Sequence, residues 1–282
     1  MHLYKTAEGF LIKRKDEFRL IDQKLEWDEL INRDNLHSYL LELWNTGKNK
    51  PVNQTDLERI ILAPIGTQEV WAAGVTYYSS RLARMEESQD SGGGDFYSRV
   101  YQAERPEIFF KATPGRVVGH RQAFRIRRDS TWDVPEPELT LLATSSGKIV
   151  AYTIGNDVSS RSIEGENPLY LPQAKTFDDC ACLGPCLFVP DVPLCLSSLV
   201  SIEIKREGAS VFSGDTTLSQ MKRSFDDLIG YLFRECTFAN GVFLMTGTGI
   251  VPGNDFSLQS GDEVSISIDS IGTLTNFAEK KK

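Results

Sequence analysis

The chain has 282 residues, with 39 acidic and 31 basic side chains, so its net charge at neutral pH is −8. Hydrophobic residues make up 40% and charged residues 25% of the chain, which is typical of a folded globular protein and excludes the disordered and fibrous classes. The acidic balance disfavours nucleic acid as a partner. Apolar runs stay well short of the roughly 20 residues that a membrane helix needs, so we expect no membrane partner.

Histidines and cysteines narrow the metal chemistry. Only three histidines are present, and His2 stands at the N-terminus, which leaves His37 and His120 for an interior site. A multi-histidine zinc or iron centre is therefore excluded, and any metal must be held mainly by carboxylates. The five cysteines lack the paired spacing of zinc sites. Together with the absence of a signal-peptide pattern, the odd number predicts reduced thiols and a cytoplasmic protein.

The first 60 residues predict a small α+β domain. Apolar residues predict short strands at 10–12 and 18–21, and apolar spacing at 34–44 predicts a helix. We place the domain boundary after this segment, so that residues 1–60 form a small domain and residues 61–282 a second, larger one.

Strands dominate the rest of the chain. They are predicted at 108–110, 138–143, 149–154, 202–204, 242–245 and 264–268. Helices are predicted at 77–87, 96–104 and 224–235, the last with Ser224 as its N-cap, and a glycine-rich loop at 88–95. Because strands and helices do not alternate, the pattern favours a mostly β, mixed α+β fold over a Rossmann fold or a TIM barrel.

A pair of glutamates is the first candidate for chemistry. Pro135 and Pro137 keep the segment extended, so Glu136 and Glu138 point to the same face of a strand. Two like charges there are either solvated or bridged by a cation. On its own the pattern is more typical of the wet face of a strand.

Two further candidates lie downstream. Asn156 and Asp157 follow an apolar strand, which either delivers them to a site or ends in a capped turn. Lys175 lies in an apolar stretch bounded by proline. Burial would lower the pKa of this lysine towards that of a useful base. Alternatively, its stem packs while its ammonium reaches water.

The last candidate is the glycine-rich segment 245–253, which contains Thr246, Gly247 and Thr248. Its glycines allow backbone N–H groups to approach an anion closely. A plain turn is the alternative.

The order of these motifs resembles the fumarylacetoacetate hydrolase (FAH) superfamily, over about residues 65–277. The matching elements are Glu136/Glu138, Asn156 to Arg161, Lys175 before Phe177-Asp178, Gly184-Pro185 and Thr246-Gly247-Thr248. The resemblance implies an FAH-like mixed β-roll and a Mg²⁺ ion, with Mn²⁺ as the alternative, held by Glu136, Glu138 and Asp157. Three carboxylates are also the ligands that a hard divalent cation prefers. The resemblance further implies a homodimer or a higher homo-oligomer.

Within the superfamily, residues 105–114 and 166–173 resemble the branch of 2-keto-3-deoxy-D-arabinonate dehydratases, enzymes of sugar-acid catabolism. Hydrolase and decarboxylase members usually carry a lid with a histidine and a glutamate, and Ser80 and Ala83 replace both here. The sequence departs from the usual superfamily pattern at two further positions, where Ser162 replaces the usual Asp and Glu164 replaces the frequent Gln.

The resemblance implies a metal-dependent hydro-lyase whose substrate is a small anionic 2-keto acid. It would convert 2-keto-3-deoxypentonate to 2,5-dioxopentanoate through an enolate that the cation stabilises. Lys175 is the expected base or enolate stabiliser and Glu107 the acid, although the two roles can be exchanged. Substrate binding is expected from Gly247, Thr248, Tyr77, Arg81 and Arg161.

Two other interpretations stay open. The first is a hydrolase or decarboxylase acting on an acylpyruvate-like diketo acid with the same metal. The second is a non-catalytic protein that binds a ligand through the metal, which the complete set of carboxylates and Lys175 argues against.

Overall fold

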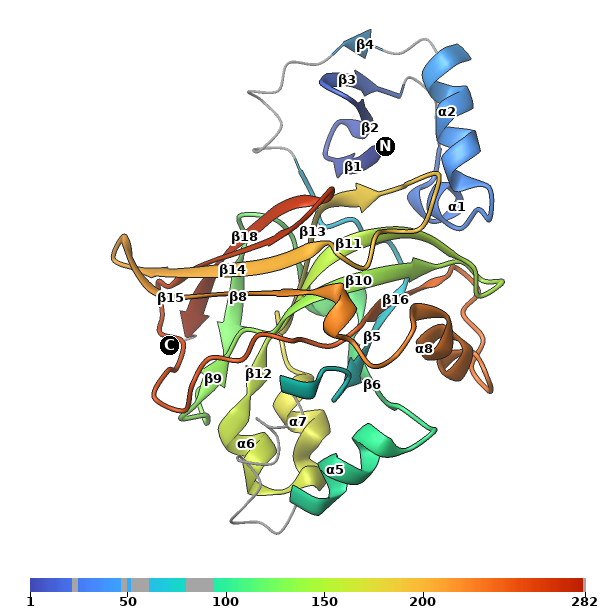
Figure 1. The fold of residues 1–282 in the computed structure, drawn as a ribbon. Helices are drawn as coiled ribbons and strands as arrows, with labels where there is room; N and C mark the ends of the chain where they lie inside the picture. The colour runs from blue at the N-terminus through green and yellow to red at the C-terminus, as the bar shows by residue number, and fades with distance from the viewer. Residues whose placement is uncertain (22–24, 47–49, 52–60, 80–93, 281–282) are drawn as a thin grey trace.

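The computed structural model describes residues 1–21, 25–46, 50–51, 61–79 and 94–280 (Figure 1). Within these residues the chain forms a large mixed sheet, a five-stranded sheet and a two-stranded ribbon. The large sheet carries the candidate site, and the five-stranded sheet packs against it.

The N-terminal segment is a meander beside two helices. Its elements are β1 (His2–Thr6), β2 (Gly9–Arg14), β3 (Glu17–Leu20), α1 (Trp27–Ile31), α2 (Leu36–Thr46) and β4 (Lys50–Pro51). The two predicted strands are confirmed, and the predicted helix is α2, which begins and ends two residues later than predicted; β1 and α1 are not predicted. Strand β1 pairs with β13 (Ala181–Phe188), so the meander continues the large sheet. The domain division after residue 60 stays a prediction, and residues 52–60 lie outside the described ranges.

The central strands of the large sheet follow one another on the side of β13 away from β1. They are, in spatial order after β13, β11 (Ile149–Asp157), β10 (Pro137–Ala143), β16 (Val242–Met245), β5 (Glu69–Gly74) and β6 (Glu107–Ala112). Every residue of β10 is buried, which explains its nearly continuous apolar sequence. Strands β10 and β11 are antiparallel, and Pro137 lies opposite Asn156. This register places the glutamate pair beside the end of β11.

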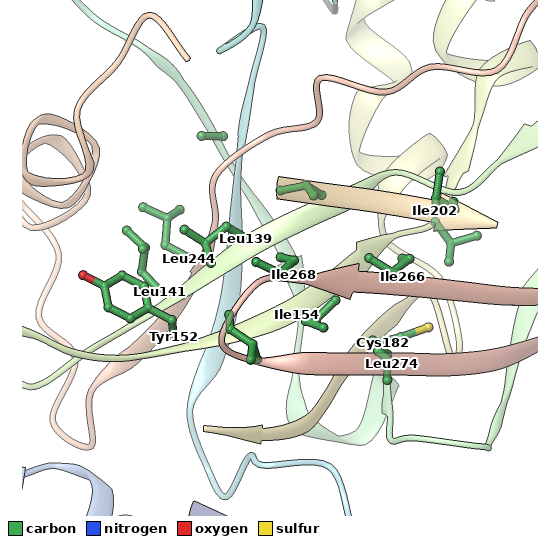
Figure 2. Close-up of a cluster of buried hydrophobic side chains, with 14 of the residues drawn as sticks. Leu139, Leu141, Tyr152, Ile154, Cys182, Ile202, Leu244, Ile266, Ile268 and Leu274 are labelled. Atoms are coloured by element: carbon green, nitrogen blue, oxygen red, sulfur yellow. The ribbon is translucent and has the colours of Figure 1, made fainter. Parts of the chain in front are cut away.

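The five-stranded sheet covers one face of these strands. Its order is β15 (Ala209–Thr217), β14 (Leu199–Arg206), β17 (Glu263–Ile268), β18 (Gly272–Lys280) and β8 (Ala123–Ile126). Figure 2 shows Ile202, Ile266 and Ile268 of this sheet in one apolar cluster with Leu139 and Ile154 of the large sheet. The period-2 pattern of β17 arises because alternate residues enter this core. The predicted α+β, mostly β fold is confirmed.

Short elements complete the described chain. They are β7 (Val117–Val118), β9 (Asp133–Val134), β12 (Ser159–Ser160), α5 (Gly94–Gln102), α6 (Arg161–Glu166), α7 (Leu171–Lys175), α8 (Phe225–Leu232) and three 3₁₀ turns (Pro114–Arg116, Pro168–Tyr170 and Leu218–Gln220). Among the described helices, none combines the length and the apolar character needed to cross a membrane.

The predicted helices agree in part. Ser224 caps α8 as predicted, since its hydroxyl accepts the Asp227 N–H at 3.1 Å, but the helix ends at Leu232 rather than at residue 235. Helix α5 begins at Gly94, two residues earlier than predicted. Most of the predicted helix 77–87 and of the loop 88–95 lies outside the described ranges, and Tyr77 itself forms a β-bridge with Met221.

Candidate metal centre and active site

Three buried carboxylates converge where β10 begins and β11 ends. Glu136 precedes β10, Glu138 lies within it, and Asp157 is the last residue of β11. Each offers an oxygen, and these three oxygens lie within 4.8 Å of one another. Asn156 does not cap a local turn, because its side-chain oxygen accepts the Glu136 N–H at 3.0 Å. The antiparallel register therefore assembles the triad that the sequence predicts as metal ligands.

The charges of the triad repel one another. Burial and the neighbouring Asp157 and Glu136 raise the pKa of Glu138 well above its usual range. A divalent cation between the carboxylates would remove this repulsion, and carboxylate oxygens are the ligands that Mg²⁺ prefers. The residues present therefore fit a hard divalent cation.

Lys175, the last residue of α7, points into the triad. Its Nζ lies 2.8 Å from Glu136 Oε2, 3.2 Å from Asp157 Oδ2 and 2.6 Å from Ser159 Oγ. The side chain is fully buried, so the alternative in which the ammonium reaches water is wrong. Of the two alternatives that the sequence leaves open for Lys175, the structure shows the buried one.

A second buried lysine, Lys111 on β6, is not among the predicted site residues. Its Nζ forms an ion pair with Asp157 Oδ1 at 2.5 Å and donates to the carbonyls of Val158 at 2.9 Å and Lys175 at 2.6 Å. The signal that could have found it is a single lysine inside the apolar strand segment 108–112. Such a lysine needs a buried anion as its partner.

Arg161 and Glu164 lie one turn apart on α6. Arg161 Nη2 forms an ion pair with Glu136 Oε1 at 2.9 Å. Glu164 Oε2 lies 3.9 Å from Arg161 Nε, and Glu164 Oε1 lies 3.9 Å from Lys175 Nζ. Both side chains are buried. Arg161, predicted to bind substrate, thus also holds a triad carboxylate.

The segment 246–248 closes the other side of the triad. The Gly247 N–H donates to Glu138 Oε2 at 2.6 Å, so this amide contacts a triad residue. The backbone φ of Gly247 is +93°, and a Cβ there would lie 2.0 Å from Thr76 Oγ1. Glycine is therefore required. The Thr248 hydroxyl donates to the Ile250 carbonyl at 3.1 Å.

These side chains line a small cavity. Its lining comprises Ala73, Gly74, Val75, Phe109, Glu136, Glu138, Asp157, Arg161, Lys175, Gly247 and Thr248. Glu107, the predicted acid, is not in this lining. It starts β6 opposite Gly74, where a Cβ would lie 2.1 Å from Glu107 Oε2, so its carboxylate packs on the glycine next to the cavity.

The predicted substrate-binding residues of the segment before α5 are only partly described. Tyr77 is buried, with its ring so close to Gly249 that a Cβ there would lie 2.6 Å from Tyr77 Cδ1. Burial and the charge of Glu138 raise the pKa of the Tyr77 phenol. Arg81, Ser80 and Ala83 lie outside the described ranges.

Together, the fold and the site define a class: a mixed β protein with a buried carboxylate triad suited to a hard divalent cation, next to a buried lysine. Residues 78–277 match the family model described as Fumarylacetoacetate (FAA) hydrolase C-terminal, and the chain belongs to this family. The predicted superfamily is confirmed.

Two relatives carry names of the predicted branch. A "Probable 2-keto-3-deoxyxylonate dehydratase" of Haloferax volcanii is 49% identical over 226 residues, which are 80% of this chain and 77% of that protein. A "2-dehydro-3-deoxy-D-arabinonate dehydratase" of Saccharolobus solfataricus is 44% identical over 224 residues, 79% of this chain and 75% of that protein.

Solved structures agree with this placement. 2-Keto-3-deoxy-D-arabinonate dehydratase in its apo form superposes with a TM-score of 0.84 at 34% identity, covering 100% of this chain and 99% of that one. The same enzyme complexed with magnesium and 2,5-dioxopentanoate gives a TM-score of 0.83 with the same identity and coverage.

Proposed function

We propose that this protein is a Mg²⁺-dependent dehydratase that converts 2-keto-3-deoxypentonate to 2,5-dioxopentanoate. The observation that carries the proposal is the buried triad with Lys175 Nζ beside it, 2.8 Å from Glu136 and 3.2 Å from Asp157. A structure of a 34% identical dehydratase that holds magnesium and 2,5-dioxopentanoate superposes on the whole chain, which supports the same ion and product here.

Glu136, Glu138 and Asp157 are the residues that would hold the ion, with Mn²⁺ as the alternative to Mg²⁺. When bound, the divalent cation supplies a Lewis acid that favours negative charge on the keto oxygen of the substrate. Arg161, Gly247 and Thr248 line the same cavity and are proposed to contact the anionic substrate.

The overall reaction removes one water. A proton leaves carbon 3 and the hydroxyl on carbon 4 leaves with a proton as water, which gives the 3,4-unsaturated keto acid. A proton then leaves carbon 5 and one is added at carbon 3, and the resulting enol takes up a proton at carbon 4 and loses its hydroxyl proton, so that carbon 5 becomes an aldehyde. Lys175 lines the cavity, so we assign it to the carbon-3 proton or to the negative charge on the keto oxygen. Glu107 packs against Gly74, which lines the cavity, and is assigned to the leaving hydroxyl.

The two roles of Lys175 can be separated by solvent exchange. Wild-type protein with Mg²⁺ and pyruvate, which has the same reactive carbon but no leaving hydroxyl, is expected to incorporate deuterium from D₂O at that carbon. If Lys175 is the base, Lys175→Met and Lys175→Arg both lose the exchange. If it only stabilises negative charge, Lys175→Arg retains it while Lys175→Met loses it.

The substrate itself is tested by product analysis. The protein with Mg²⁺ and 2-keto-3-deoxypentonate should yield 2,5-dioxopentanoate, identified by NMR, and chelation with EDTA should stop the reaction. Cleavage of an acylpyruvate to pyruvate and an acid, without dehydration of the sugar acid, would instead show the hydrolase or decarboxylase alternative. Ser80 and Ala83, where water-activating members carry His and Glu, support dehydration.

The remaining proposals concern assembly and location. We propose at least a homodimer acting in the cytoplasm on a small anionic 2-keto acid, without nucleic acid or membrane partners. The net charge of −8 supports the exclusion of nucleic acid. Light scattering at low micromolar concentration measures the oligomeric state directly.

A further inference from the structure

Each triad carboxylate has at least one oxygen against a protein donor or cation. Lys111 Nζ lies 2.5 Å from Asp157 Oδ1, and Arg161 Nη2 lies 2.9 Å from Glu136 Oε1. The Gly247 N–H donates to Glu138 Oε2 at 2.6 Å. Three different elements, β6, α6 and the turn after β16, therefore each occupy one carboxylate oxygen.

These partners are held in place. Lys111 is fully buried and is tied to the carbonyls of Val158 and Lys175 as well as to Asp157. Arg161 is also buried. The Gly247 amide is fixed by its positive φ and by the hydrogen bond from Thr76 Oγ1 to the Thr246 carbonyl at 2.7 Å. Rotating a carboxylate to present both oxygens would break these contacts.

The second oxygens of Glu136 and Asp157, Oε2 and Oδ2, both lie against Lys175 Nζ, which lines the cavity. A cation that reached Asp157 Oδ1 instead would lie against the Lys111 ammonium, and one that reached Glu136 Oε1 would lie against the Arg161 guanidinium. Like-charge repulsion disfavours both positions, and an ion at the second oxygens would require Lys175 to move away from them.

We infer that Lys111, Arg161 and the Gly247 amide restrict all three carboxylates to one coordinating oxygen each, and so select Mg²⁺ or Mn²⁺ over Ca²⁺. Mg²⁺ takes an octahedron of six ligands at roughly 2.1 Å, whereas Ca²⁺ takes about six to eight oxygens and commonly uses both oxygens of a carboxylate. The inference rests on the proposed function, because it assumes that the triad holds the ion.

The same restriction suits the proposed substrate. Three single oxygens supply half of an octahedron, which leaves three positions. A 2-keto acid can fill two of them with its keto and carboxylate oxygens, and water can fill the third. Carboxylates that bound through both oxygens would crowd out these positions. Lys111 and Arg161 are therefore positioning residues for the ion, in addition to any other role.

Calorimetric titration of Mg²⁺ and of Ca²⁺ into metal-free protein tests the inference. We expect wild-type protein to bind Mg²⁺ more tightly than Ca²⁺. In Lys111→Met, which removes the ammonium and keeps an unbranched side chain of similar length, the ratio of the two dissociation constants should shift towards Ca²⁺ by about tenfold or more. Because both ions carry the same charge, the general effect of removing a positive charge cancels in this ratio.

Lys205→Met is the matched control, since Lys205 pairs with Glu203 on the surface and its loss changes the net charge equally. Its ratio should stay at the wild-type value. Arg161→Met applies the same test to Glu136, and thermal unfolding shows which variants are folded. The inference is overturned if both folded variants keep the wild-type ratio, or if wild-type protein binds Ca²⁺ as tightly as Mg²⁺.

Failure of the proposed function looks different. If wild-type protein binds neither ion, or dehydrates no 2-keto-3-deoxy acid with Mg²⁺, the proposed site or activity is wrong. If Mg²⁺-dependent dehydration is observed but the ratio in Lys111→Met and Arg161→Met does not move, only the selectivity mechanism is wrong.

Discussion

The Glu107 carboxylate occupies the space that a side chain on Gly74 would fill. The two residues face each other across β5 and β6, and a Cβ on Gly74 would lie 2.1 Å from Glu107 Oε2 and 2.6 Å from its Cδ. Glu107 can therefore keep its observed position only if residue 74 is glycine.

Gly74→Ala should displace Glu107 and reduce turnover. A displacement of about 1 Å at a catalytic group costs on the order of 100-fold in rate, so we expect a loss of that size in kcat. The measurement is steady-state kinetics with 2-keto-3-deoxypentonate. Gly115→Ala is the control, because a Cβ there meets nothing within 4 Å. Full activity of Gly74→Ala would remove Glu107 from the chemistry.

Glu138→Gln should abolish Mg²⁺ binding while the fold is retained. Glutamine keeps an oxygen for the Gly247 N–H but removes the charge, and it relieves the repulsion from Asp157 and Glu136. A ligand that binds only the folded state raises its melting temperature. We therefore expect Mg²⁺ to raise the melting temperature of wild-type protein and leave that of the variant unchanged. An equal rise in both would argue against Glu138 as a ligand.

Asp133 should make the stability depend on pH. Burial raises the pKa of its carboxyl from 3.8 to about 6 in the folded protein. Between these values the folded state binds more protons than the unfolded state, so the free energy of unfolding falls as pH rises and levels off above about 6. At roughly 1.4 kcal/mol per pKa unit, the full effect is at most about 3 kcal/mol.

Asp133→Asn removes this titration. The free energy of unfolding of the variant relative to wild-type protein should increase from about pH 4 to about pH 6 and stay constant above. Urea denaturation at several pH values measures it. A difference that does not change with pH would show that Asp133 ionises normally in the folded protein.

Asp28 should stabilise the whole chain, although it belongs to the N-terminal segment. Its carboxylate accepts the Thr67 hydroxyl at 2.5 Å and the Gln68 side-chain amide at 2.9 Å, which connects α1 to the chain before β5. We expect Asp28→Ala to cost about 1–3 kcal/mol, because the exposed Thr67 hydroxyl and the buried Gln68 amide both lose this acceptor. Calorimetry should show one unfolding transition at a lower temperature. Two separate transitions would instead show that the segment unfolds independently.

The sequence predicts those parts of the site whose signal is local. Glu136 and Glu138 stand two residues apart in an extended segment, and Asp157 follows an apolar strand. The glutamate pair and the strand end can each be recognised from about ten consecutive residues. The three carboxylates come together only because Pro137 pairs with Asn156, and such a contact between two strands cannot be recognised from a short stretch of sequence. Only the resemblance to a family supplied that long-range relationship.

Lys111 shows what local patterns miss. In sequence it is one polar residue in a strand, which usually faces solvent, but β6 places it against Asp157. Strand β11 likewise continues past its apolar part to Asp157, because Asn156 and Asp157 find partners across the sheet. Such partners come from elements distant in sequence, so tertiary contacts decide these cases.

The pairing of Pro137 with Asn156 also links ion binding to the correctness of the fold. A slip of β10 against β11 by one residue would turn every side chain of β10 to the opposite face, and Glu138 would leave the triad. Only the correctly paired hairpin would then gain free energy from binding a cation. The ion would thus discriminate against misaligned strands during folding, apart from any role in the reaction.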